Sequence, residues 1–154
     1  TMNLRNTLLA FASVFMCIAA AQADDNDGPA TRTALHPRYQ QECAACHVAY
    51  LPRMLPAESW QRLMNNLPRH FGTDASLDPA TTKQLSAWLT SHAGDRRAPP
   101  QDRITRSSWF LHEHDEISAK TWQRASSKSP SNCAACHTRA DQGDFHERFI
   151  RIPR

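Results

Sequence analysis

The pentapeptide CAACH occupies residues 43–47 and recurs, letter for letter, at residues 133–137. The C-x-x-C-H spacing is the attachment signature of c-type haem, because the two thiols can bond to one porphyrin and the following histidine can bind its iron. Each copy therefore predicts one covalently attached haem c, two in all, with His47 and His137 as iron ligands. The cysteines predicted to form the thioether bonds are Cys43, Cys46, Cys133 and Cys136.

Paired C-x-x-C sequences also occur in zinc sites and in disulfide-forming proteins. A four-cysteine zinc ribbon would not need the histidine after each pair. Its two pairs are also separated by roughly 15–20 residues, far fewer than lie between residues 47 and 133. A thioredoxin-type C-x-x-C would lie near a βαβ pattern, and the sequence shows none. We therefore favour two haem attachment sites over a zinc or disulfide site.

The first 23 residues have the features of a secretory signal peptide. Arg5 supplies a positive charge, an apolar stretch follows over residues 8–20, and Ala-Gln-Ala at residues 21–23 is a typical cleavage site. The apolar stretch is shorter than the ~18–20 residues that span a membrane, so the mature protein is not expected to be membrane-embedded. Cys17 would leave with the signal, and the four remaining cysteines all belong to the two motifs.

The charge of the chain is nearly balanced. Cleavage after residue 23 would leave 131 of the 154 residues and lower the net formal charge from +3 to +2. Without a basic run, this balance argues against the cationic surface that nucleic-acid binding requires, so no nucleic-acid partner is expected. A chain of this length has limited side-chain area for a core, and two haem groups would supply much of its apolar interior.

Helical periodicity, caps and turn residues predict a mainly α fold without convincing strands. The helices are expected over residues 39–49, 58–70, 79–92 and 104–119. The third of these has the clearest start, because Asp78 can cap it and Pro79 suits its first turn. A further helix, capped by Ser131 or Asn132, would carry the second motif.

The two motifs divide the chain into two predicted lobes. The predicted segments are a signal peptide (1–23), a flexible N-terminus (24–35), a first haem lobe (36–93), a linker (94–103) and a second haem lobe (104–154). The N-terminal stretch is polar, which is typical of an unanchored terminus. The linker contains Gly94 and the adjacent prolines Pro99 and Pro100, which interrupt helices.

Each iron needs a second axial ligand, and six histidines outside the motifs are candidates. For the first haem we predict His70, which extends the apolar stripe of the helix over residues 58–70. For the second we predict His114, which lies one turn after Phe110 on the same helical face. The alternative is that these are ordinary surface histidines, since histidine is intermediate in burial. The rival ligands are His92, His112 and Met64.

Several separated motifs make the sequence similar to a known family. From Glu42 almost to Pro153, the chain resembles the small dihaem cytochromes c of the bacterial periplasm called DHC. Besides the two pentapeptides, the motifs that carry the resemblance are Leu55-Pro56-x-x-Ser59-Trp60, His70-Phe71-Gly72, Trp109-Phe110-x-x-x-His114 and Ile152-Pro153. Their number and order make the match more specific than two haem signatures alone.

The resemblance implies two small haem-bearing lobes, the N-terminal one resembling a class I cytochrome c. It also implies two histidine ligands on each iron, His47 with His70 and His137 with His114. The implied location is the periplasm and the implied role is electron transfer. One implied partner is a small monohaem cytochrome c of the sphaeroides-haem-protein type, and another is a membrane cytochrome b.

The residues favour an electron carrier over an enzyme, because two histidines on each iron leave no coordination position for a substrate. The alternatives are a dihaem peroxidase-like enzyme and a gas-binding haem sensor, and both need a distal ligand that can be displaced. Peroxidases of this kind are usually much longer chains. Binding of carbon monoxide to the reduced protein would separate the carrier from both alternatives.

Overall fold

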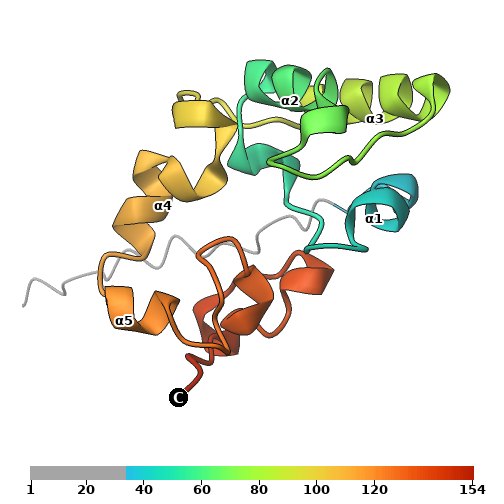
Figure 1. Cartoon of the computed structure of the whole chain (residues 1–154). Helices are drawn as coiled ribbons and strands as arrows, with labels where there is room; N and C mark the ends of the chain where they lie inside the picture. Colours follow the sequence, from blue (N-terminus) through green and yellow to red (C-terminus); the bar gives the residue numbers. More distant parts are fainter. Residues whose placement is uncertain (1–33) are drawn as a thin grey trace, which may run out of the picture. The chain divides into compact units, whose positions relative to one another are not determined.

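Short helices joined by turns make up the part of the chain that the structure describes, residues 34–154 (Figure 1). This computed structural model contains no strand within those residues, apart from isolated bridges between single residue pairs. The expected mainly α fold is confirmed. The predicted signal peptide, residues 1–23, lies outside the described residues, as does almost all of the predicted flexible N-terminus.

Proline sets the start of several helices. The α-helices of the described residues are α1 (Pro37–Cys43), α2 (Ala57–Met64), α3 (Pro79–Ser91), α4 (Ser108–Glu113) and α5 (Ala119–Trp122). The 3₁₀-helices are η1 (Pro52–Met54), η2 (Leu67–Arg69), η3 (Pro100–Asp102), η4 (Ile104–Arg106), η5 (Cys133–Ala135), η6 (Ala140–Gln142) and η7 (Glu147–Phe149). Proline occupies the first turn of α1, α3 and three 3₁₀-helices, where its missing N–H breaks no intrahelical bond.

Helix α3 agrees closely with its prediction. The Asp78 carboxylate accepts a hydrogen bond from the Thr81 backbone N–H at 2.9 Å, and Pro79 is the first helical residue. The helix ends at Ser91, one residue before the expected end, and its buried side chains include Leu85 and Leu89.

The first two predicted helices are shorter than expected. The helix predicted over residues 39–49 ends at Cys43, so the rest of the first motif forms a turn. The helix predicted over residues 58–70 ends at Met64 and resumes as η2. Pro68 explains the second difference, because it has no N–H to donate and its ring clashes with the preceding turn of an α-helix.

The helix predicted over residues 104–119 is also interrupted. Ser107 ends η4 and caps α4, accepting a hydrogen bond from the Phe110 N–H at 3.2 Å, so the chain changes direction there. The second motif lies in η5 rather than in a capped α-helix. The Asn132 side chain makes no cap and instead donates to the Ser127 carbonyl at 3.1 Å.

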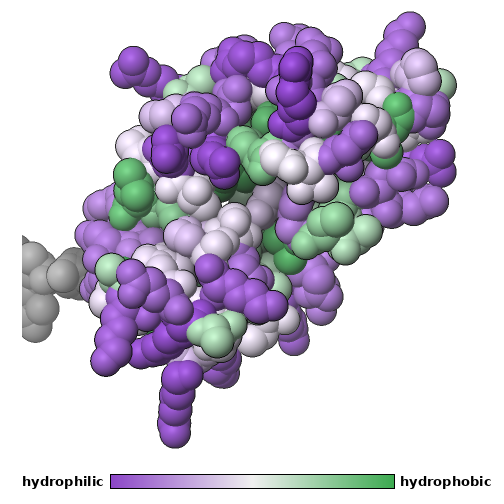
Figure 2. Space-filling view, in the orientation of Figure 1, coloured by the Kyte–Doolittle hydropathy of each residue, from purple (hydrophilic) through white to green (hydrophobic). Residues whose placement is uncertain are grey.

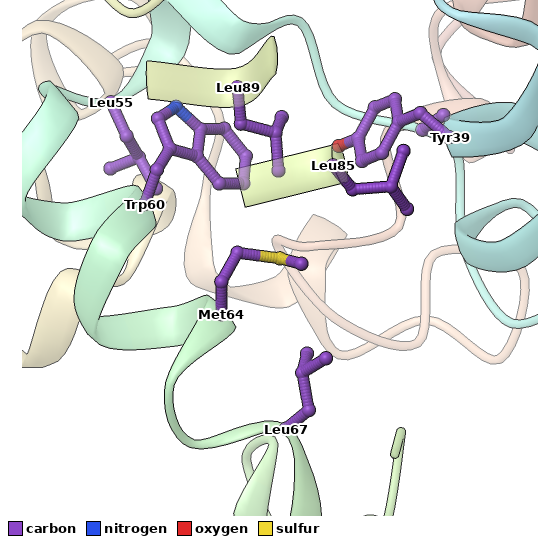
Figure 3. Packing of buried hydrophobic residues seen from close by; sticks show 8 residues of the cluster. Tyr39, Leu55, Trp60, Met64, Leu67, Leu85 and Leu89 are labelled. Carbon is purple, nitrogen blue, oxygen red and sulfur yellow. The ribbon is translucent and has the colours of Figure 1, made fainter. Parts of the chain in front are cut away.

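The side-chain core gathers around α2 and α3, which pack against each other. Figure 3 shows Trp60 and Met64 of α2 with Leu85 and Leu89 of α3, and Tyr39 joins them from α1. The indole N–H of Trp60 donates to the Pro52 carbonyl at 2.7 Å, so this buried polar atom is satisfied. The first predicted lobe therefore has a core of its own.

The second predicted lobe has much less of a side-chain core. Among the buried hydrophobic residues of the described chain, only Phe110 and Ala140 come from residues 104–154. Figure 2 shows one face of the molecule, on which hydrophilic residues dominate and hydrophobic residues form small separate groups. Within residues 34–154, no helix is both long enough and apolar enough to cross a membrane.

Gly94, just after the first predicted lobe, packs closely against the backbone of residues 53–55, which precede α2. Its N–H donates to the Leu55 carbonyl at 2.9 Å. A Cβ atom at this position would lie 2.2 Å from the Arg53 carbonyl oxygen, which is backbone and cannot rotate away. Only glycine therefore fits without moving the chain.

We expect Gly94→Ala to lower the free energy of unfolding by about 1–3 kcal/mol, because the added methyl forces a backbone shift. Urea unfolding of the haem-loaded protein measures this change. The control is Asp95→Ala at the exposed neighbouring position, where an effect within about 0.5 kcal/mol is expected. Equal stability of the two variants would contradict the close approach at residue 94.

The predicted linker is tied to α2 by an ion pair. The Arg62 guanidinium donates to both Asp102 carboxylate oxygens, at 2.9 and 2.6 Å. These hydrogen bonds lower the pKa of Asp102 below its usual value. Since the folded pKa is depressed, the stabilisation is present above the unfolded pKa and is lost as the pH falls through the folded pKa.

We expect Asp102→Asn to lower the melting temperature at neutral pH. The difference from the wild type should shrink as the pH falls below the ordinary range of aspartate, because the wild-type carboxyl is then protonated as well. Thermal unfolding followed by circular dichroism from pH 7 downward tests this. A difference that stays constant over that range would show that the ion pair does not contribute.

Candidate haem centres

The first motif begins in a helix and ends in a turn. Helix α1 ends at Cys43, and the turn that follows leads to His47, which lines the same cavity as Trp60 and Met64 of α2. The Nδ1 atom of His47 lies 2.7 Å from the Val48 carbonyl oxygen. Because a carbonyl oxygen only accepts, Nδ1 carries the proton and Nε2 remains available to bind a metal.

His70 is presented by a tight turn after η2. The Thr73 N–H donates to the His70 carbonyl at 3.0 Å, and Phe71 and Gly72 have positive φ angles of 51° and 99°. The Arg103 guanidinium lies over the Phe71 ring, 4.3 Å from its centroid, and so covers this unusual turn. Burial, followed by the neighbouring His47, lowers the pKa of His70.

The structure brings His47 and His70 opposite each other. Their ring centroids are 6.1 Å apart and their planes differ by 27°. Two imidazoles bound to opposite sides of one metal ion, with metal–nitrogen bonds of about 2.0–2.1 Å, would place their centroids about 6 Å apart. The pair therefore fits a single iron between the rings.

The second motif is fixed by the C-terminal segment. The Arg151 N–H donates to the Cys136 carbonyl at 2.8 Å, and the Thr138 N–H donates to the Phe149 carbonyl at 3.1 Å. The Phe145 ring lies 5.2 Å from the His137 ring. These contacts orient the motif even though no long helix supports it.

His114 ends helix α4 and faces the second motif. Its Nδ1 lies 2.9 Å from the Phe110 carbonyl oxygen, which fixes the proton on Nδ1, and its ring stacks on Phe110 at 4.1 Å. The His114 and His137 centroids are 6.1 Å apart, with an angle of 66° between the planes. This separation again fits one metal ion. Burial, followed by the nearby His114, lowers the pKa of His137.

The rival ligands lie elsewhere or have other contacts. His92 is exposed, and its Nδ1 lies 2.8 Å from the Trp88 carbonyl oxygen. His112 is exposed on α4. Met64 is buried in the core and also lines the cavity at the first centre, but the imidazole that faces His47 is His70.

The two remaining histidines cap helices. His36 and His146 accept backbone hydrogen bonds at the starts of α1 and η7.

One cavity of about 870 Å³ extends along both histidine pairs. The predicted haem-binding residues that line it are Cys43, Cys46, His47, His70, Cys133, His137 and His114. The remaining wall is largely apolar and aromatic, with side chains such as Leu67, Trp109 and Phe145. Such a wall suits a large hydrophobic ring held by a few polar groups.

The donor set also fits haem better than a bare metal ion. Within residues 34–154, no three His, Cys, Asp or Glu side chains come together as a metal-ion site. Each histidine pair would offer two ligands, and a porphyrin would supply the others. Burial raises the pKa of the Cys43 and Cys133 thiols to about 11, so both are neutral in the chain without cofactor.

Tyr50 and Phe145 line the cavity and contact the two motif histidines, yet the sequence analysis did not single them out. Tyr50 follows His47 by three residues, but no periodic pattern joins the two because the chain is not helical there. Proximity to the motif was the only signal that could have found Tyr50.

Comparison with known proteins agrees with this geometry. Residues 39–145 match the sequence model of the dihaem cytochrome c family, DHC. The crystal structure of a dihaem cytochrome c from Shewanella baltica OS155 has 37% sequence identity and a TM-score of 0.69, and the match covers 76% of this chain and 92% of that one. DHC purified from Rhodobacter sphaeroides has 46% identity and a TM-score of 0.65, over 72% of this chain and 97% of that one.

A second structure, described as a dihaem cytochrome c from Rhodobacter sphaeroides, has 42% identity and a TM-score of 0.65, with the same coverage of 72% and 97%. The comparison with curated proteins gave no match. The chain therefore belongs to the dihaem cytochrome c family, and the two covalently attached haem c groups predicted from its motifs are the cofactors of that family.

Proposed function

We propose that this protein is a periplasmic electron carrier in which each of two haem irons is held by two histidines. Membership of the dihaem cytochrome c family supports a haem-based role in electron transfer. The observation that carries the finer proposal is the pairing of His47 with His70 and of His114 with His137. Each pair has the ring separation that one metal ion between two imidazoles requires.

The residues of the chain hold and tune the cofactors. The motif histidines would bind the irons on one side, and His70 and His114 on the other. Bound haem supplies the one-electron chemistry of its iron. The backbone carbonyls that accept from His47 and His114 fix the orientation of these rings and make them stronger donors to a metal. Two imidazoles favour a lower reduction potential than a pair containing methionine.

A peroxidase-like enzyme or a gas sensor would need a distal side chain that leaves the metal. The ring of His114 is held by a hydrogen bond to the Phe110 carbonyl and by stacking on the Phe110 ring. The turn that presents His70 is covered by Arg103. Because the His114 ring is held by a hydrogen bond and by stacking, and the His70 ring packs against Phe71, the carrier is favoured over these alternatives.

The periplasmic location rests on the predicted signal peptide and on the resemblance to DHC. The resemblance also supports two partners for this carrier, a small monohaem cytochrome c of the sphaeroides-haem-protein type and a membrane cytochrome b. Binding assays with each purified partner, at low and high salt, would test the pairing, since transient redox complexes are steered by charge.

We expect the reduced wild-type protein not to bind carbon monoxide rapidly. His70→Ala should open the first iron, and His114→Ala the second, so that each variant binds carbon monoxide at one of its two haems. Optical titration of the reduced protein measures the stoichiometry. The matched controls are His92→Ala and His112→Ala, because both side chains are exposed.

Rapid, stoichiometric binding by the wild type would support the enzyme or sensor alternative instead. Carbon monoxide binding by the control variants, but not by the variants of His70 and His114, would show that the distal ligands are misassigned.

Loss of one haem should affect the two lobes differently. We expect Cys133→Ser combined with Cys136→Ser to remove the second haem and to loosen residues 104–154, which bury few hydrophobic side chains of their own. The α2–α3 core should remain folded. Intact mass gives the haem count, and amide hydrogen exchange locates the loosened segment. Uniform loss of protection in both lobes would contradict this division.

A further inference from the structure

The side chain of Tyr50 contacts a histidine of the first motif and the segment just before the second motif. Its ring stacks on the ring of His47, with centroids 4.7 Å apart and planes that differ by 19°. Its hydroxyl donates to the backbone carbonyl of Ser131 at 2.8 Å, 81 residues further along the chain. Ser131 lies two residues before Cys133, the first attachment residue of the second motif.

Tyr50 is held in place from the first lobe. The buried Tyr39, which is 2% exposed, donates from its hydroxyl to the Tyr50 carbonyl at 3.0 Å. The backbone of Tyr50 is thus bonded within the first lobe, and its hydroxyl reaches Ser131.

The next residue, Leu51, makes a second contact with residues 104–154, through its apolar side chain. Leu51 is 1% exposed, and its Cδ2 atom lies so near Gly143 that a Cβ added there would be 3.0 Å away. Gly143 lies two residues before Phe145, whose ring packs against His137. Residues 50 and 51 thus contact the chain on both sides of the second motif.

We propose that Tyr50 is a positioning residue that fixes the distance and orientation between the two haem centres. This inference rests on the proposed function, because the coupling between two redox centres matters only if both carry electrons. The stacked ring determines where the link starts, at His47, and the hydroxyl determines where it ends, at Ser131. The contact of Leu51 with Gly143 limits movement of the second predicted lobe relative to Tyr50.

The experiment uses the full haem-loaded protein and compares Tyr50→Phe with Tyr39→Phe. Tyr50→Phe keeps the ring that stacks on His47 and removes only the hydroxyl that reaches Ser131. Tyr39→Phe removes a hydroxyl of the same chemistry whose hydrogen bond joins two residues of the first lobe. The readouts are the haem–haem couplet in the Soret circular dichroism and the separation of the two midpoint potentials.

Tyr50→Phe is expected to reduce the couplet amplitude and to change the separation of the two potentials. Tyr39→Phe is expected to lower the melting temperature by about 4 °C, because it breaks a partly buried hydrogen bond, and to reduce the couplet less than Tyr50→Phe does, because the bond to Ser131 remains. Tyr50→Leu, which also removes the ring, should reduce the couplet further and shift the spectrum of the first haem.

Three results would overturn the proposal. One is a couplet in Tyr50→Phe equal to that of the wild type, and another is an equal loss in Tyr39→Phe, which would indicate general loosening. The third is a wild type without a couplet, since the centres would then not be held in a fixed, close relation. Carbon monoxide binding by the same wild-type sample tests the carrier function separately, because it does not depend on the couplet.

Discussion

The facing of two imidazoles, His47 with His70 and His114 with His137, is the constraint around which this chain is arranged. Each ring of a pair comes from a different segment, 23 residues apart for the first pair (47 and 70) and for the second (114 and 137). The chain must therefore fold back twice to the same separation of 6.1 Å. Short helices, proline starts and turns with positive φ serve this purpose better than long helices would.

The two predicted lobes surround their histidine pairs in different ways. The first builds its half of the cavity on α2 and α3, and most residues of its buried cluster also line that cavity. The second has little such core, and its shape depends on local caps, on the segment ending at Arg151 and on whatever fills the cavity. A haem in that lobe would therefore contribute more to folding than the haem in the first, because binding energy becomes folding energy where the site is not formed beforehand.

The parts of the structure that depend on local chemistry could be predicted from the sequence. The cap at Asp78 predicted α3, and the repeated pentapeptide predicted the motif histidines and cysteines. His70 and His114 were also placed opposite the expected partners, although the helices that were to carry them are broken at Pro68 and at Ser107. His70 takes its position from the turn after Pro68, which helical periodicity does not describe, whereas His114 ends α4 one turn after Phe110, as the periodicity indicated. The contact between Tyr50 and Ser131 depends on tertiary packing over 81 residues, and no local pattern encodes it.

The two rings of each pair are held by different forces. In each pair, one ring has its Nδ1 on a backbone carbonyl and its face on an aromatic ring: His47 with Tyr50, and His114 with Phe110. The Nδ1 atoms of His70 and His137 are buried without a hydrogen-bond partner among the described residues. Phe71 and Phe145, the aromatic rings beside them, give packing but no hydrogen bond that would fix a tautomer.

In the first centre the hydrogen-bonded ring is His47, which belongs to the motif. In the second centre it is His114, which lies outside the motif. Because a hydrogen bond donated by Nδ1 strengthens an imidazole as a metal ligand, the proposed ligation would place the stronger donor on the motif side of the first centre and on the distal side of the second. The two centres thus differ in environment although their attachment sequences are identical, and the difference arises from the backbone that surrounds each ring.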